Sequence, residues 1–409
     1  MAPLSHDELL EIFSRLPAKA IYKFTSTSKS FSKLPKETYF ASKQTQNSLL
    51  RDDTCFFIQP DITQSYNVHV EFHPLPGEEL SSGVPQSSLE FLSNSAKILS
   101  SSNGLILCRA TGENEVKLFI TNPATQSWLP IPTPGEYKQN GTSIGAVDLK
   151  IVLECDDKDD YMVYLFYDNL VDWSSSNLDC KVYHSNEGVW KSKQERFFTG
   201  SRKLKFDMPV HHRGAVHFIS DCFPSWNKKS PYFRPYIMSY NYESGNSRML
   251  RVPKEARKGS HDLTCDMGIF KWGKATDPNQ SICLVRLRKH VFTIWTLTHY
   301  ETSEWRRVLK IRVKAMVKDH PIIRVKGYAV LNGDLLVFAT EKKVYGCGLN
   351  DMRIQEICDH EFDFNVLRFT SYKDTLRTFG TGAGTLPLSL HTCGTRAGTL
   401  PLPSHKQFW

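Results

Sequence analysis

The sequence predicts a multi-domain α+β protein, in which a small module of three short helices precedes a large all-β domain that is propeller-like. Apolar residues at helical spacing fill the first forty positions, and Pro17 and Pro35 interrupt them. Further along, short β-branched and aromatic runs alternate with turn residues, which is typical of strands. One strand–turn–apolar unit then recurs at a spacing close to the ~50 residues of some propeller blades.

The first predicted helix opens with a capping box. Ser5 can accept a hydrogen bond from the backbone N–H of Glu8, whose side chain reaches back to the Ser5 N–H. An apolar stripe follows at i, i+3, i+4 and i+7, formed by Leu9, Ile12, Phe13 and Leu16. Leu10 points away from that stripe, so the helix is apolar on more than one side. Pro17 ends this helix and suits the first turn of the next.

The second and third predicted helices are also short. Ile21, Phe24 and Thr25 repeat helical spacing, and Phe31 and Leu34 follow a polar run. Three such helices are marginal on their own, because so few residues bury little surface. The module is therefore either a helical cap on the β domain or a docking module whose spare apolar faces a partner fills.

The β domain is predicted from short apolar runs separated by turn residues, and no convincing long helical pattern follows about residue 50. The strand candidates are Phe56–Ile58, Val68–Phe72, Leu105–Cys108, Val116–Ile120, Ile151–Leu153, Tyr161–Phe166, Val216–Ile219, Tyr236–Tyr240, Ile282–Val285, Phe292–Leu297, Tyr328–Leu331, Leu335–Phe338 and Val344–Cys347. The large apolar residues after successive turns are Trp128, Trp190, Met249, Trp305 and Ile354, at spacings of 62, 59, 56 and 49 residues. Each is expected to fill space between neighbouring sheets. Residues 55–376 hold about six such units, which suits a closed propeller and leaves an open β-sandwich array as the alternative.

Composition limits the function classes. The chain has 409 residues, ten cysteines and a formal charge of +8. It shows no C-x-x-C pair, no secretory signal and no apolar run of about 18 residues, which argues against a cysteine zinc site, secretion and a membrane span. Lys310, Arg312 and Lys314 alternate with apolar residues, as on a half-exposed strand, so no nucleic-acid partner is predicted. We expect a soluble protein of the cytoplasm or nucleus, with reduced thiols, no metal and no cofactor.

Three motifs that suggest chemistry lack the context that the chemistry requires. Residues 141–145 read Gly-Thr-Ser-Ile-Gly, but a nucleophile elbow needs a strand before it and a helix after it. The acidic cluster at residues 156–160 lacks the glycine of a calcium loop and suits a solvated hairpin tip. His211 and His212 point to opposite faces of a predicted strand, and His217 is expected to be a hydrogen-bonded core residue. The sequence therefore predicts no catalytic residue.

The N-terminal module resembles an F-box, as found at the start of many plant F-box proteins. The positions that carry the resemblance are Leu4, Asp7, Leu9, Leu10, Ile12, Leu16, Pro17, Lys23, Phe24, Ser28 and Lys29. The β domain is similar to the kelch-like F-box-associated domain of those proteins. The motifs that carry this second resemblance are Ser101–Cys108, Asn122–Thr125 with Trp128, Gly214–Phe218, Ile294–Leu297 and Ser303–Trp305.

The resemblance implies a domain order. An F-box covers residues 1–45, a linker and first β unit cover 46–97, and an F-box-associated β domain covers 98–376. The resemblance stops there. The tail over 377–409 repeats Ala-Gly-Thr-Leu-Pro-Leu, and its Gly, Thr and Pro content predicts disorder.

The resemblance also implies a function without catalysis. The chain would be the substrate-recognition subunit of a Skp–cullin–F-box ubiquitin ligase. It would bind a Skp-like adaptor, through it a cullin, and an unknown target protein, with no nucleic-acid or membrane partner. The adaptor-binding residues implied are Leu4, Leu9, Leu10, Ile12, Leu16, Pro17, Phe24 and Phe31.

Two alternatives stay open. Ser5, Ala20 and Phe31 stand where the family usually has Pro, a larger aliphatic residue and Trp, which leaves an F-box-like binding protein without ligase assembly. Propellers also host enzymes and glycan-binding modules. Acidic residues, or a Tyr–Cys pair, converging at the propeller centre would favour that second alternative.

Overall fold

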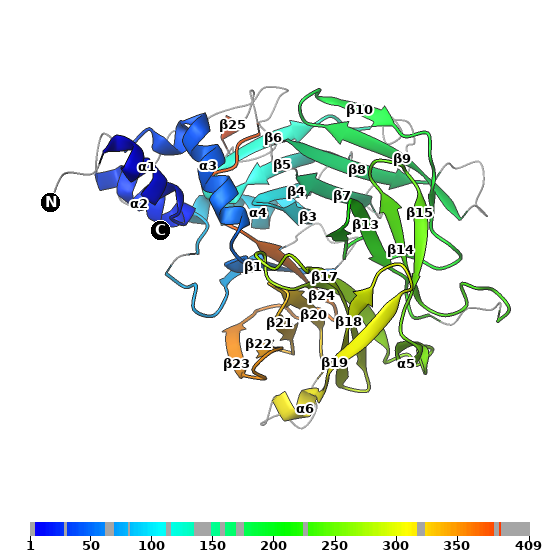
Figure 1. The fold of residues 1–409 in the computed structure, drawn as a ribbon. Coiled ribbons are helices and arrows are strands. Elements are labelled where there is room, and N and C mark those ends of the chain that lie inside the picture. The colour runs from blue at the N-terminus through cyan, green and yellow to red at the C-terminus, as the bar shows by residue number, and fades with distance from the viewer. Residues whose placement is uncertain are drawn as a thin grey trace.

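The computed structural model shows a group of N-terminal helices beside a ring of β-sheets (Figure 1). It describes residues 5–27, 31–61, 69–80, 82–111, 116–134, 149–155, 160–168, 176–223, 228–316, 324–379 and 384–385. Leu4, the Gly-Thr-Ser-Ile-Gly motif at 141–145 and the first three aspartates of the acidic cluster lie outside these ranges.

The N-terminal module contains the expected helices. They are α1 (His6–Ser14), α2 (Ala18–Thr27), the 3-10 helix η1 (Leu34–Lys36) and α3 (Thr38–Leu49). The predicted capping box of α1 is confirmed, since the Glu8 N–H donates to Ser5 Oγ at 3.3 Å and the Ser5 N–H donates to the Glu8 carboxylate at 2.7 Å. Helix α3 continues past residue 45, where the sequence had placed the end of the module.

The described β-strands form six antiparallel sheets that follow one another along the chain. The first contains β3 (Ala96–Ser102), β4 (Leu105–Ala110), β5 (Leu118–Asn122) and β6 (Ser127–Ile131), with the short β25 (Gly384–Thr385) on β6. The second contains β7 (Lys150–Cys155), β8 (Tyr161–Tyr167), β9 (Asn177–His184), β10 (Val189–Ser192) and β11 (Phe197–Phe198). The third contains β12 (Val210–His212), β13 (Ala215–Ile219), β14 (Tyr236–Asn241) and β15 (Ser247–Arg251).

The remaining sheets complete the ring. The fourth contains β16 (Asp266–Trp272), β17 (Ser281–Arg288), β18 (Val291–His299) and β19 (Glu304–Arg312). The fifth contains β20 (Gly327–Leu331), β21 (Leu335–Ala339), β22 (Lys343–Gly348) and β23 (Ile354–Asp359). The sixth joins β24 (Leu367–Tyr372) to β1 (Cys55–Pro60) and β2 (Glu71–Pro74) from the other end of the chain.

The sixth sheet closes the ring. Strand β1 pairs with β24 from Cys55 opposite Tyr372 to Pro60 opposite Leu367. The buried side chain of Gln59 then ties this sheet to the first, because it donates to the Ile98 carbonyl at 2.7 Å and accepts from the Ile98 N–H at 3.1 Å. The first β segment after the helices is therefore part of the last sheet, and the fold is a closed six-bladed propeller.

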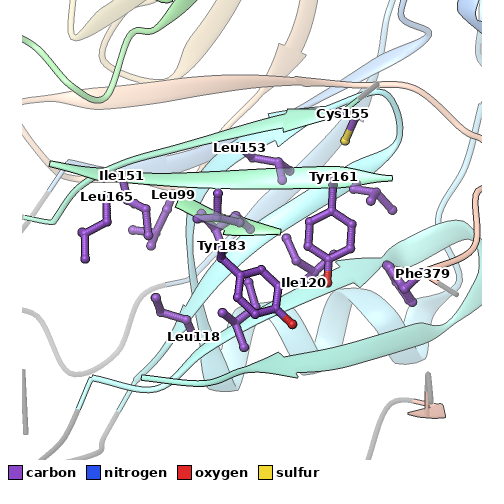
Figure 2. Packing of buried hydrophobic residues seen from close by; sticks show 14 of the residues in the cluster. Leu99, Leu118, Ile120, Ile151, Leu153, Cys155, Tyr161, Leu165, Tyr183 and Phe379 are labelled. Carbon is purple, nitrogen blue, oxygen red and sulfur yellow. The ribbon is translucent and has the colours of Figure 1, made fainter. Parts of the chain in front are cut away.

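Apolar packing between neighbouring sheets supports the same closure. The described residues form six apolar clusters in the β domain, one between each pair of adjacent sheets, including the pair formed by the sixth and first sheets. Figure 2 shows the cluster between the first two sheets, with Tyr161 beside Tyr183 and Phe379 at one side. Phe379 and Arg377 are both buried, so the chain just beyond residue 376 packs on the propeller.

Three short α-helices lie among the described residues after residue 50. Helix α4 (Gln86–Ser95) precedes β3 and contacts β2 and β3, and α5 (Lys254–Arg257) and α6 (Val313–Met316) are single turns. Helix α4 buries Phe91 and Leu92 in the cluster between the sixth and first sheets. It therefore covers an apolar face of the three-stranded sixth sheet.

The recurrent large apolar residues pack between neighbouring sheets, as predicted, and lie on the outer strands of the first five sheets. Trp128, on β6, is buried, and Trp190 and Trp305 are half-buried on β10 and β19. The indole of Trp190 donates to the Pro132 carbonyl at 2.7 Å, and that of Trp305 donates to the Arg251 carbonyl at 2.9 Å. In both cases the acceptor belongs to the outer edge of the preceding sheet, so these indoles join neighbouring blades.

We expect Trp305→Phe to lower the free energy of unfolding by about 1 kcal/mol, because it keeps an aromatic ring but leaves the Arg251 carbonyl without its donor. Trp190→Phe is the matched variant at the equivalent position and should behave alike. Urea denaturation measures both. A Trp305→Phe protein as stable as the wild type would contradict the bridging role.

Candidate functional site

The N-terminal helices form a small core that the propeller completes. Its buried members are Ala18, Ile21, Leu34, Phe40 and Ala41 from the helices, with Ala124 and Leu376 from the β domain. Hydrogen bonds reinforce this docking. Gln44 accepts from the Leu376 N–H at 2.9 Å and donates to the Leu16 carbonyl at 3.2 Å. The ammonium group of Lys19 donates to the Ser82 carbonyl at 2.9 Å.

The segment between the helices and β1 is held as well. The Asn332 side chain accepts from the Asp53 N–H at 2.7 Å and donates to the Asp53 carbonyl at 2.8 Å. Asn332 and Gly333 both have positive φ and form the tight turn between β20 and β21, the turn chemistry that Asn-Gly favours. The helices are therefore attached to the propeller at the edge where the β20–β21 turn lies.

The seven described residues among the eight predicted for adaptor binding differ in exposure. Ile12 and Phe24 are 47% and 44% exposed. Leu9 and Pro17 are half-buried, whereas Leu10, Leu16 and Phe31 are half-buried against the helical core. The predicted stripe on α1 thus splits, because Phe13 and Leu16 turn inward with Leu10 while Ile12 faces outward.

An aromatic contact holds Phe24 in place. The Phe13 ring lies 5.3 Å from the Phe24 ring and 4.9 Å from the Phe31 ring, centre to centre. Phe24 therefore packs against the Phe13 ring, which itself packs on the helical core. Much of the Phe24 surface stays exposed. Ile12 on α1 and Phe24 on α2 are the two exposed residues of the predicted set, and we call them the outer pair.

A second candidate site is the channel at the centre of the ring. It encloses about 1410 Å³ and is lined by the inner strands β3, β7, β12, β16, β20 and β24 with their connecting loops. Its lining holds ten Lys or Arg and six Asp residues, a net charge of +4. One mouth lies beside residues 49–53 and the Asn332-Gly333 turn, next to the helices. We call this the proximal mouth and the opposite end the distal mouth.

Known proteins resemble this chain over most of its length. A family model described as F-box protein At3g26010-like, beta-propeller, matches residues 77–324, more than half of the chain. The chain belongs to this family of F-box proteins. Its fold, N-terminal helices followed by a six-bladed β-propeller, is the one that the sequence predicts.

Individual relatives agree with the family. F-box protein At5g49610 of Arabidopsis thaliana is 23% identical over 350 residues, which cover 82% of this chain and 88% of the relative. F-box protein At5g07610 of the same plant is 24% identical over 219 residues, 52% of this chain and 50% of the relative. Among solved structures, the crystal structure of a nidogen/laminin complex aligns with 78% of this chain and 99% of that chain, at 11% identity and a TM-score of 0.42. A TM-score of this size supports no conclusion about function.

His217 of this F-box protein is a hydrogen-bonded core residue, as predicted. His217 is fully buried, donates from Nδ1 to the Val210 carbonyl at 3.1 Å and accepts at Nε2 from the Tyr300 hydroxyl at 2.8 Å. Burial lowers its pKa to about 3. His211 instead pairs with Glu154 and Tyr242. Within the described ranges, no group of three or more His, Cys, Asp or Glu side chains is placed to hold a metal ion.

Two cysteines meet near the distal mouth of this propeller. A hydrogen bond between the Cys222 and Cys265 side chains raises the pKa of Cys222 and lowers that of Cys265, so Cys265 is the more acidic of the two thiols. Sequence reasoning missed this pair, because the residues are 43 positions apart in different blades and share no motif.

We expect diamide to oxidise Cys222 and Cys265 to a disulfide, because a thiol of lowered pKa beside a second thiol is the reactive arrangement for that chemistry. Peptide mass spectrometry without reduction should recover the linked pair, and dithiothreitol should reverse it. Cys222→Ser should abolish the link, whereas Cys347→Ser, a change at a buried thiol of the fifth sheet, should leave it intact. Preferential linkage of any other cysteine would contradict the pairing.

Proposed function

We propose that this F-box protein is the substrate-recognition subunit of a Skp–cullin–F-box ubiquitin ligase. The observation that carries the proposal is the outer pair. Ile12 and Phe24 keep nearly half of their surfaces exposed on helices whose other apolar residues are packed. Exposed apolar side chains beside a packed core are typical of a docking surface.

The adaptor contact would centre on Ile12 and Phe24. The remaining predicted residues, Leu4, Leu9, Leu10, Leu16, Pro17 and Phe31, would either border that contact or support it from the core. We propose the division 1–45 for the F-box, 46–97 for the linker and first β unit, 98–376 for the β domain and 377–409 for the tail.

Ubiquitin transfer would then occur by proximity. The adaptor and cullin hold a ubiquitin-conjugating enzyme near a target that the β domain binds, which raises the local concentration of target lysines. No residue of this chain takes part in bond making. Several hydrogen bonds fix the helices on the propeller, so target and adaptor would be held in a defined relative orientation.

The compartment would be the cytoplasm or nucleus. All nine described cysteines are free thiols, which suits a reducing compartment. None of the helices within the described ranges is long and apolar enough to cross a bilayer.

The test is co-purification of the full chain with a Skp-like adaptor and a cullin. We expect a complex of the three proteins that elutes together in size-exclusion chromatography. A folded chain that fails to retain the adaptor would overturn the proposal, and would leave the alternative of a binding protein without ligase assembly.

A further inference from the structure

The distal mouth of the channel carries a group of exposed apolar side chains. Phe223, Leu263 and Val366 are 69%, 89% and 53% exposed, and all three line the channel. Leu263 and Val366 precede the inner strands β16 and β24, and Phe223 follows the second strand of the third sheet. In antiparallel sheets these positions share one edge, opposite the edge where Tyr372 of β24 meets Cys55 of β1, next to the helices.

The backbone beneath Phe223 is firmly anchored. Arg202 is buried, with a side chain only 2% exposed. Its guanidinium donates to the Phe223 carbonyl at 2.7 Å, to the Asp221 carboxylate at 3.0 Å and to the Tyr232 carbonyl at 3.0 Å. The loop is thus fixed by a buried ion pair while the ring of Phe223 projects into solvent.

The backbones that carry Leu263 and Val366 are also held by hydrogen bonds. Asp262 accepts from the Thr264 N–H at 3.0 Å and from Arg288 at 3.2 Å, which holds the turn that presents Leu263. The Val366 carbonyl accepts from the Asp61 N–H at 3.0 Å. Apolar side chains on held loops are pre-organised for binding, because little conformational entropy is lost when a partner covers them.

Positive charge surrounds these side chains. Arg324 and Lys203 are exposed and line the same channel. Among the residues that the structure describes, Arg324 has neither a hydrogen bond nor an ion pair. Two of the channel aspartates are already neutralised, Asp221 by Arg202 and Asp266 by Lys205. The field at the distal mouth therefore favours an anionic partner.

We infer that the distal mouth binds an extended acidic segment of a partner protein, with apolar side chains of that segment contacting Phe223, Leu263 and Val366. A single strand of nucleic acid fits less well, because Leu263 and Val366 offer no ring for base stacking. This inference rests on the proposed function, for which it names the chemistry of the target segment.

The binding test uses the full chain and fluorescein-labelled peptides in an anisotropy titration. The probe has three Glu, then Phe and Leu, then three Glu. We expect it to bind at least about 10-fold more tightly than a peptide with two Ser at the centre, and than one with Lys in place of Glu. Equal binding of the three peptides, or tighter binding of a twelve-nucleotide oligothymidine, would overturn the inference.

Variants locate the site. Leu263→Asp and Arg324→Glu should each weaken binding of the acidic probe at least about 5-fold without lowering Tm, because both side chains are exposed. Met352→Asp and Lys310→Glu are matched controls at exposed positions of the β22–β23 turn and of β19, and should bind as the wild type does. Loss of binding in the controls, or its retention in both distal variants, would contradict the location.

The same preparations are also tested for retention of the Skp-like adaptor. This second measurement distinguishes failure of the distal-mouth inference from failure of the ligase proposal. A protein that retains the Skp-like adaptor but does not prefer the acidic probe overturns the distal-mouth inference alone. A protein that prefers the probe but does not retain the adaptor overturns the ligase proposal and leaves a peptide-binding propeller.

Discussion

Ile12→Asp should weaken adaptor binding about 100-fold while Tm stays near that of the wild type. Burying a carboxylate in an apolar contact costs several kcal/mol, and anchors at the centre of an interface dominate its energy. Ile12 is 47% exposed in the free chain, so the folded protein itself loses little. Phe24→Asp should give a loss of the same order. Isothermal titration with a Skp-like adaptor and a thermal melt measure the two quantities.

The control is an exposed aromatic residue outside the predicted set. Tyr39 lies on α3 and is 69% exposed, so Tyr39→Asp should change neither adaptor binding nor Tm. Leu16→Asp is a poor test, because Leu16 packs on the helical core and its loss would unfold the module. Wild-type affinity in both Ile12→Asp and Phe24→Asp would show that the outer pair is not the adaptor contact.

Features encoded by neighbouring residues could be predicted from the sequence. The capping box needs only Ser5 and Glu8, and both hydrogen bonds form. The period of the large apolar residues predicted about six units, because the first five blades each place one such residue on the outer strand. The Trp190 and Trp305 indoles meet that requirement.

Features that depend on distant contacts could not be predicted in this way. Strand β1 pairs with β24 across more than 300 residues, and no local period encodes that pairing. Helix α4 has three apolar residues among ten, so its helical pattern is weak. The stripe on α1 splits because Ala124 and Leu376 of the propeller help to form the helical core. Phe223, Leu263 and Val366 lie in loops, where apolar residues follow no periodicity.

A buried carboxyl beneath the helices should make the protein's stability depend on pH. Asp374 is buried between the sixth sheet and the loop at Gly83, whose N–H donates to it at 3.0 Å. Its second oxygen has no hydrogen-bond partner among the described residues. Burial raises the pKa of Asp374 to about 7 from an ordinary value of 3.8, although the Gly83 N–H and the charge of Lys19 on α2 oppose that rise.

The sign of the effect follows from these two values. Between about pH 4 and pH 7 the folded protein holds a proton on Asp374 that the unfolded chain has lost. Stability must therefore fall as pH rises through this window and level off above about pH 7. A difference of about three pKa units corresponds to about 4 kcal/mol. The destabilisation is absent below about pH 4.

Asp374→Asn should remove this pH dependence. We expect the variant to exceed the wild type in free energy of unfolding by up to about 4 kcal/mol at pH 8 and to match it near pH 4, because an amide accepts from Gly83 without carrying charge. Asp363→Asn, which removes an exposed carboxylate from the loop at the other end of β24, should leave the pH profile unchanged. Urea denaturation from pH 4 to pH 8 measures all three proteins. The Asp374 carboxyl lies where Lys19 of the F-box meets the propeller. If stability falls with pH as steeply in Asp374→Asn as in the wild type, the pH dependence does not arise at this junction.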